Sequence, residues 1–236
     1  MPETVRAEGT GKAFALDFPT ASDHISQIVR KTGTFYEAEM LADARARLFF
    51  PQCAVDVGAH VGNHTVYFAG VLGLRTISFE PNPASFAQLT SNVAANGLSD
   101  LCQLNPVAVG DRSGRGHPVP GLGDNSGMAR VEAAADGEVR IVTLDDELAG
   151  VARIDLLKID VEGWEIAVLK GAQRTLDRCR PLLYVEVSHE NFNEVSARLV
   201  ARNYVCWKCF NATPTFLFLP DERLNSGRKF SLLPRR

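Results

Sequence analysis

Two carboxylates and a lysine lie close together in the second half of the sequence, where they could carry out acid–base chemistry. Asp160 and Glu162 alternate with Val161, so an extended chain turns both side chains to one side. A carboxylate can remove a proton from a hydroxyl group, and a carboxylate pair can bind Mg²⁺ through its oxygens. We therefore expect the catalytic residues to be Asp160, Glu162, His189 and Lys158. A magnesium site at Asp160 and Glu162 is the alternative.

Each of these side chains also has a purely structural interpretation. Glu162 would cap the helix that begins near Trp164, and Asp160 would order a loop. His189 follows an apolar segment and would lie exposed at the start of a helix. The residues alone leave both interpretations open.

A second group of residues has the pattern of a ligand-binding turn. The apolar run Cys53–Val57 leads into Gly58 and Gly62, and the amphipathic segment Thr65–Leu72 follows. A strand, a glycine turn and a helix present bare backbone and a helix N-terminus to a ligand. Glu80 ends the next apolar segment, where an acid typically hydrogen-bonds ribose hydroxyls.

Glycines at this spacing also occur in tight turns that bind nothing. Two further residues favour a binding site. Asp56 lies near the carboxyl end of the first strand, where it can reach a ligand amine, and Glu80 ends the second strand in register with it. The spacing Gly58-x-x-x-Gly62 differs from the G-x-G-x-x-G of dinucleotide-binding proteins.

These residues come together if the chain forms a doubly wound α/β sheet. We expect a single sheet of seven mostly parallel strands, with an antiparallel hairpin at the C-terminal end and helices at the N-terminal end. The strand-like runs are Cys53–Val57, Thr76–Glu80, Leu101–Leu104, Val139–Leu144, Ile154–Ile159, Leu182–Val187, Tyr204–Phe210 and Thr215–Leu219. If Cys53–Val57 and Ile154–Ile159 are neighbours, Asp160 and Glu162 lie in the crevice at the topological switch point.

The domain organisation follows from the same patterns. Residues 1–50 are expected to form an N-terminal helical lid or extension, irregular to about residue 20, on a domain of residues 51–236. Residues 111–138 are rich in glycine, which predicts an insertion of loops or short hairpins. Tyr36 and Glu37 lie between the two N-terminal helices, either beside the ligand site or as a packing residue and a helix cap.

Composition narrows the functional class. The chain has 236 residues, 45% of them apolar, which suffices for one substantial core. A net charge of −3 argues against a protein that binds nucleic-acid phosphates. No apolar run is long enough to span a bilayer, so we expect no membrane span and a cytoplasmic location, in keeping with five scattered cysteines. The oligomeric state stays open, and a dimer is compatible with the sequence.

Several short motifs together resemble the FkbM family of S-adenosylmethionine (SAM) dependent methyltransferases. They are Val55–Asn63, Phe79–Pro83, Ala108–Gly110, Thr143–Asp145 and Leu157–Gly163. The resemblance covers most of the chain and implies a class I Rossmann-like fold, SAM as cofactor and O-methylation of a hydroxyl on a sugar, polyketide or other small metabolite. His60 departs from the family, which more often has asparagine there.

The resemblance also implies roles for individual residues. Gly58 and Gly62 would face the methionine part of SAM, Asp56 its amino group and Glu80 its ribose. The full set of implied cofactor contacts is Glu37, Asp56, Gly58, His60, Gly62, Asn63, Glu80, Pro81, Asn82, Asn105, Val107, Ala108 and Asp160. Asn125, Ser126 and Asn211 lie in loops that would shape the acceptor pocket.

Two other functions compete with this one. Asn82-Pro83 followed by Asn92–Leu98 also resembles a stretch of some tRNA methyltransferases, although the sequence pI of about 6.0 argues against RNA binding. A nucleotide-binding module without methyl transfer is the third interpretation.

Overall fold

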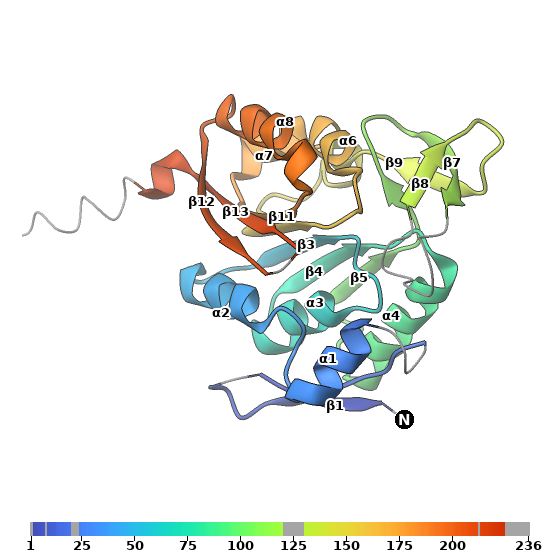
Figure 1. The fold of residues 1–236 in the computed structure, drawn as a ribbon, viewed down its shortest axis with the longest axis vertical. Coiled ribbons are helices and arrows are strands. Elements are labelled where there is room, and N and C mark those ends of the chain that lie inside the picture. Colours follow the sequence, from blue (N-terminus) through green and yellow to red (C-terminus); the bar gives the residue numbers. More distant parts are fainter. Residues whose placement is uncertain (1, 8, 20–23, 120–129, 212, 225–236) are drawn as a thin grey trace, which may run out of the picture.

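The structure, a computed structural model, describes residues 2–7, 9–19, 24–119, 130–211 and 213–224. Within these residues the strands form a seven-stranded, a four-stranded and a two-stranded sheet. Figure 1 shows the large sheet in the middle of the molecule, with helices above and below it. No helix of the described ranges is long and apolar enough to cross a membrane.

The large sheet is doubly wound, as expected. From one edge to the other it contains β12 (Tyr204–Phe210), β13 (Thr215–Pro220), β11 (Leu182–Glu186), β10 (Leu156–Ile159), β3 (Cys53–Val57), β4 (Arg75–Phe79) and β5 (Cys102–Asn105). The strands from β11 to β5 are parallel, and β13 and β12 form the antiparallel hairpin at the edge. Because the strand order reverses between β3 and β10, a ligand crevice is expected at their carboxyl ends.

Alternating side chains of the strands divide the core into two halves. On β3, Ala54 belongs to one apolar cluster, whereas Val55 and Val57 belong to the other. The first half is covered by α1 (His24–Thr32), α2 (Ala38–Arg47), α3 (Asn63–Val66), the π-helical turn η1 (Tyr67–Val71) and α4 (Pro83–Ala95). The second half is covered by α5 (Leu144–Glu147), α6 (Glu165–Lys170), α7 (Gln173–Cys179) and α8 (His189–Val200).

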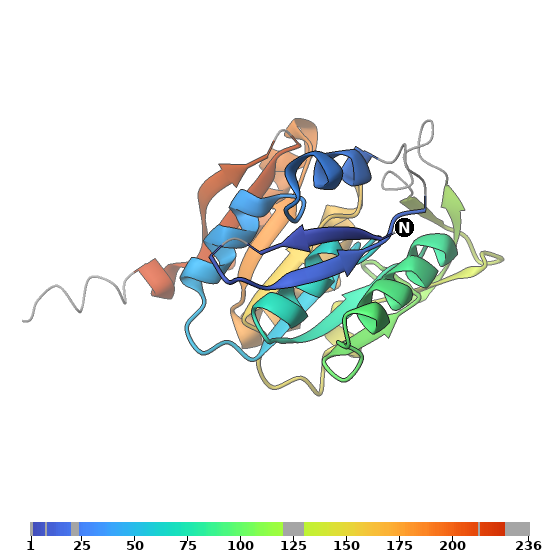
Figure 2. The same ribbon diagram turned by 90° about the horizontal axis from the view of Figure 1, so that it is seen from below.

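The N-terminal residues are more regular than expected. We expected residues 1 to about 20 to be irregular, and this is wrong: β1 (Glu3–Arg6) and β2 (Ala13–Leu16) form an antiparallel hairpin. Figure 2 shows the hairpin across the face that carries α1, α2 and α4. Val5 and Leu16 are the buried residues of the two strands. One buried residue per strand of four gives no detectable alternation, which explains the error.

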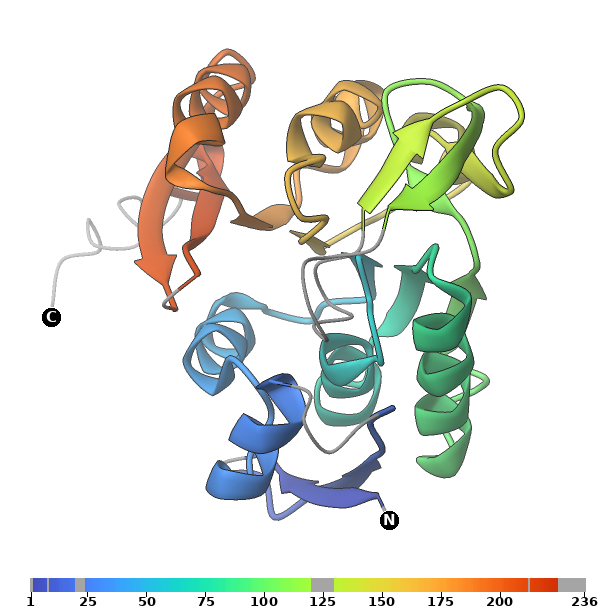
Figure 3. The ribbon, with the colours of Figure 1, turned by 45° about the vertical axis from the view of Figure 1, so that its right-hand side comes forward.

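The glycine-rich region contributes to a small separate sheet. Its strands are β6 (Ala108–Val109), β9 (Val139–Val142), β7 (Gly114–Val119) and β8 (Arg130–Ala133), in that spatial order. The hairpin β7–β8 lies within the expected insertion, whereas the strand expected at Val139–Leu144 joins this sheet and not the large one. Figure 3 shows the small sheet at one end of the molecule, beside α6. The domain boundary near residue 50 stays a prediction.

Two glycines allow close approaches around the turn after β3. Gly58 has a φ of +80°, and a Cβ there would lie 1.7 Å from the carbonyl oxygen of Asp160. Gly62 has a φ of +92°, and a Cβ there would lie 2.6 Å from Leu89 Cδ1 of α4. The first glycine therefore brings the ends of β3 and β10 together, and the second lets the following helix pack on α4.

We expect Gly58→Ala to destabilise the protein much more than Gly73→Ala. Gly73 is the matched control, because its φ is +70° and a Cβ there meets nothing within 4 Å. Left-handed strain alone costs roughly 1–2 kcal/mol, and Gly58→Ala adds a backbone clash to that strain. Urea unfolding of both variants measures the difference. Equal losses of unfolding free energy would show that the Gly58–Asp160 approach is not a structural constraint.

Candidate functional site

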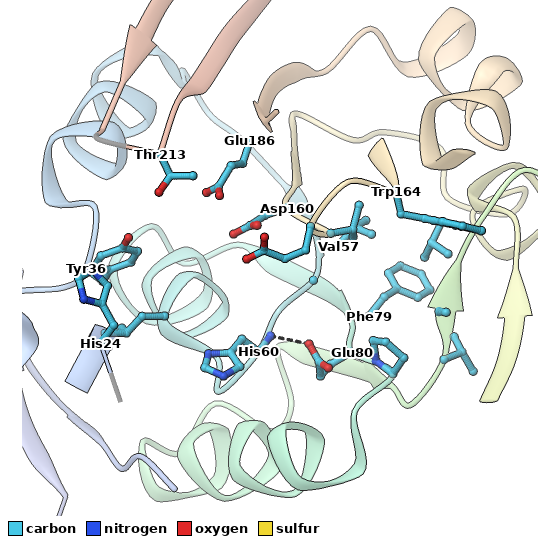
Figure 4. A pocket seen from close by; sticks show the side chains of 18 residues that line it. His24, Tyr36, Val57, His60, Phe79, Glu80, Asp160, Trp164, Glu186 and Thr213 are labelled. Atoms are coloured by element: carbon cyan, nitrogen blue, oxygen red, sulfur yellow. Dashed lines mark hydrogen bonds between the residues drawn. The ribbon is translucent and has the colours of Figure 1, made fainter. Parts of the chain in front are cut away.

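A cavity of about 250 Å³ lies at the carboxyl ends of β3, β4, β10 and β11, around the switch point (Figure 4). Its apolar part is lined by Phe79, Pro81, Trp164 and the segment Val107–Val109. Its polar part carries several carboxyl groups together with Tyr36, which precedes α2. The cavity therefore combines an apolar region with a cluster of acids.

Glu80 links these two parts. Its Oε2 accepts a hydrogen bond from the backbone N–H of His60, and its Oε1 accepts one from that of Asn82, both at 2.8 Å. The first bond is drawn in Figure 4. Burial raises the pKa of Glu80 to about 7, against the opposing effect of these two backbone bonds. The carboxyl group is thus held in one orientation where it borders the cavity.

A row of polar residues crosses the large sheet beside the cavity. Ser78, Asp56, Lys158 and Tyr184 are successive partners in register on β4, β3, β10 and β11. Thr65 Oγ1 of α3 donates to Asp56 Oδ2 at 2.7 Å. Asp56 is fully buried and is absent from the lining of this cavity. Its charge therefore faces the interior of the sheet beside Lys158.

Lys158 is the buried cation of this row. Its side chain is 2% exposed, and its Nζ donates to Asp160 Oδ2 at 2.9 Å. Burial alone would lower the pKa of Lys158, but the charges of Asp160, Asp56 and Glu37 outweigh it and raise the pKa above its ordinary value. The side chain is therefore an ammonium group at neutral pH.

Three carboxyl groups meet at the ends of β10 and β11. Oxygens of Asp160, Glu162 and Glu186 all lie within 4.8 Å of one another. Burial and the charge of Asp160 raise the pKa of Glu162 to about 7 and that of Glu186 to about 9. This spacing would suit a bridging divalent cation, but Asp160 already has a cation, the Lys158 ammonium.

The structure brings Lys158, Asp160 and Glu162 together and leaves His189 apart. His189 is exposed at the first turn of α8 and does not line the cavity. This position matches the structural interpretation of His189, an exposed residue at the start of a helix. Glu162, in contrast, lines the cavity and does not act as the helix cap of the structural interpretation. Glu165 instead accepts the hydrogen bond from the backbone N–H of Gly163, at 2.7 Å.

The expected contacts near the N-terminus hold the chain in place. The helix expected at Thr65–Leu72 begins at Asn63, whose side-chain amide binds both the N–H and the C=O of Tyr36, at 3.0 and 3.1 Å. Glu37 makes no helix-capping bond. Its Oε2 lies 2.9 Å from His64 Nε2, and its Oε1 accepts from Asn211 at 2.5 Å.

The remaining expected contacts include residues that line the cavity and residues that lie outside it. Asn82 caps α4 through Ala84 and Ser85, and Asn105 donates to the carbonyl oxygen of Ser78. The expected contacts that line the cavity are Gly58, His60, Glu80, Pro81, Val107, Ala108 and Asp160. Those that do not are Glu37, Asp56, Gly62, Asn63, Asn82, Asn105 and Asn211. Asn125 and Ser126 lie outside the described residues.

Sequence reasoning did not single out Glu186 as a site residue. The signal was present, since Glu186 ends a parallel strand next to β10, as Asp160 follows β10 itself. Thr213, Trp164 and His24 also line the cavity. They lie in a turn, a loop and the start of α1, where no periodic pattern marks them.

A glycine turn after the first parallel strand and an acid after the second, on a sheet of this strand order, define the class I methyltransferase fold. A profile described as "Methyltransferase FkbM domain" matches residues 56–206, more than half of the chain. The chain belongs to the FkbM methyltransferase family.

Two curated relatives are similar to part of the chain. The 2-O-methyltransferase NoeI of Sinorhizobium fredii is 33% identical over 164 residues, 59% of this chain and 65% of that protein. The hexuronic acid methyltransferase AglP of Haloferax volcanii is 31% identical over 127 residues, 51% of this chain and 50% of that protein. The matches thus span about half to two thirds of these relatives.

Solved structures support the fold. The FkbM methyltransferase of Methylobacillus flagellatus KT superposes with a TM-score of 0.55 at 19% identity, over 73% of this chain and 44% of that one. A putative rRNA methylase of Clostridium thermocellum superposes with a TM-score of 0.51 at 11% identity, over 77% of this chain and 93% of that one. At such identities the likeness shows the fold alone.

We expect Glu186→Gln to become more stable than the wild type as the pH rises. The pKa of Glu186 is about 9 in the folded protein, above its ordinary 4.5, so folding favours the protonated acid. Its contribution to stability is complete below pH 4.5 and is lost as the pH rises towards 9. Urea unfolding at several pH values measures the difference, with the exposed Glu190→Gln as control. A difference that stays constant from pH 5 to 9 would contradict the burial of a neutral Glu186.

Proposed function

We propose that this protein is a SAM-dependent methyltransferase that transfers a methyl group to a hydroxyl of a sugar. The observation that carries the proposal is Glu80, whose two oxygens are oriented by backbone N–H groups at the border of the cavity. Membership of the FkbM family supports methyl transfer, and the names of the relatives NoeI and AglP support O-methylation and a sugar-type acceptor.

The residues present suit SAM. A carboxylate fixed at the end of β4 would accept hydrogen bonds from the two ribose hydroxyls. The apolar surface of Phe79, Pro81, Val107 and Trp164 would take the adenine. Because Gly58 has no side chain, only its backbone lies between the Glu80 region and Asp160. Bound there, SAM supplies an electrophilic methyl group on a sulfonium.

The acidic part of the cavity would receive the sulfonium and the acceptor. Carboxylates favour a cation beside them, and they can take a proton from an alcohol. Asp160 and Glu162 border the cavity at this point, and Lys158 orients Asp160. Tyr36, Thr213 and His24 border the same region and offer hydroxyl and imidazole groups to a polar acceptor.

The charge of the cavity favours a neutral acceptor. Four acids border it, against two histidines, His24 and His60, and the nearby Lys158 ammonium is paired with Asp160. A uronate or an RNA phosphate would place a negative charge beside these acids, which opposes their ionisation and costs free energy at short range. We therefore propose a neutral sugar. Methyl glycosides compared with glucuronides in a methyl-transfer assay test this preference.

We expect the protein to bind SAM, and Glu80→Gln to weaken the binding roughly 10- to 100-fold, because hydrogen bonds to charged groups contribute about 1.5–3 kcal/mol. The matched control is Asp155→Asn. Asp155 is also a buried carboxylate held by two backbone N–H groups, those of Gln52 and Cys53, but it precedes β10 at the opposite end of the strand. Calorimetric titration with SAM measures both variants. Equal affinities for Glu80→Gln and wild type would reject the ribose assignment, and no SAM binding by the wild type would reject the proposed function.

We expect turnover to be independent of Mg²⁺. The Lys158 ammonium already neutralises Asp160, so the carboxyl cluster has a permanent positive charge of its own. Turnover in EDTA, with and without added MgCl₂, measures this. A large loss in EDTA that Mg²⁺ restores would instead support a metal at Asp160 and Glu162.

A further inference from the structure

We propose that Glu186 is the catalytic base of the reaction, the group that accepts the proton of the acceptor hydroxyl. This inference rests on the methyl transfer proposed above and adds a residue that neither the sequence motifs nor the comparisons assign to the site.

The position of Glu186 places it on the acceptor side of the cavity. It ends β11, between β10 and β13, and is paired with Thr215 of β13. In Figure 4 the labelled side chains run from Thr213 through Glu186 and Asp160 to Glu80. If Glu80 holds the ribose, Glu186 is the acid farther from the adenosine.

Glu186 also differs from Asp160 in its partners. Asp160 Oδ2 accepts a hydrogen bond from the buried Lys158 ammonium. That oxygen of Asp160 is therefore already occupied by a donor. Among the described residues, none forms a hydrogen bond or ion pair with the Glu186 carboxyl group. The unpaired Glu186 is free to bind an incoming hydroxyl.

The charged groups around Glu186 come from two parts of the chain. Asp160, Glu162 and Lys158 belong to β10 and the turn after it, and Glu37 and Tyr36 belong to the segment before α2. Burial first, and then the negative neighbours, raise the pKa of Glu186 to about 9, while Lys158 acts in the opposite direction. The ionised form is therefore a stronger base than an ordinary glutamate, and a sulfonium cation nearby would favour that form.

The proposed methyl transfer needs only the acceptor, SAM and Glu186. The acceptor oxygen forms a bond to the methyl carbon while the carbon–sulfur bond breaks, and that electron pair stays on sulfur. The hydroxyl proton passes to the Glu186 carboxylate. The products are a methyl ether, S-adenosylhomocysteine and a protonated Glu186, which returns the proton to solvent before the next turnover.

The test compares wild type, Glu186→Gln and Glu186→Asp, with the exposed Glu190→Gln as control. A panel of methyl glycosides serves as acceptors. We expect Glu186→Gln to lower kcat roughly 100-fold or more, with little change in the affinity for S-adenosylhomocysteine. In the wild type and in Glu186→Asp, kcat/KM should rise with pH towards 9, and this rise should disappear in Glu186→Gln. A merely structural role would not remove the pH dependence.

A second readout does not depend on turnover. Calorimetric titration with SAM at pH 7.5, in phosphate and in Tris, gives the number of protons released on binding. The wild type should release more than Glu186→Gln, because the cation ionises Glu186, and neutral S-adenosylhomocysteine should release fewer. Equal release by both proteins would overturn the proposal.

The outcomes separate this proposal from the one it rests on. A wild type that methylates a glycoside, with an equally active Glu186→Gln, removes Glu186 as the base and leaves the proposed function intact. A wild type that binds SAM with Glu186-dependent proton release but methylates no glycoside removes the sugar acceptor and supports Glu186 as an ionising group of the site.

Discussion

The candidate site depends on one buried positive charge. Lys158 lies on the central strand β10 with its side chain 2% exposed, flanked in register by Asp56 and Tyr184 on the neighbouring strands. A buried ammonium is tolerated when it is paired and hydrogen-bonded, and Asp160 supplies that bond at 2.9 Å. The same charge allows several carboxyl groups to gather at the strand ends. Removing it would leave them to repel one another across a few ångströms.

The side of the cavity that carries Glu186 is built from distant parts of the chain. Tyr36 is fixed by the amide of Asn63, and Glu37 lies against His64 and Asn211. The hydroxyl of Tyr184 on β11 donates to Asp43 of α2 at 2.7 Å. These contacts hold the N-terminal helices to the sheet face from which Glu186 projects. We infer that this segment completes the pocket, while the close approach of Gly58 to Asp160 sets its floor.

Local patterns were sufficient to predict the sheet, the glycine turn and the position of Glu80 after β4, because each depends on a strand end and the few residues after it. The pairing of Lys158 with Asp56 was beyond such reasoning, since it depends on the register of two strands about a hundred residues apart. Asp56, expected to contact the ligand, is instead buried beside that lysine. Glu186 obeyed the same strand-end rule as Asp160 but lacked a motif, and the hairpin β1–β2 was too short for its pattern to show.

A crystal structure with bound S-adenosylhomocysteine would show whether the carboxyl cluster takes part in methyl transfer. We expect the ribose hydroxyls on Glu80, the adenine against Phe79 and Pro81, and the sulfur atom facing Asp160 and Glu186. A ligand bound with its sulfur directed away from these two acids, or outside this cavity, would contradict this role, because the carboxyl cluster would then have no part in methyl transfer.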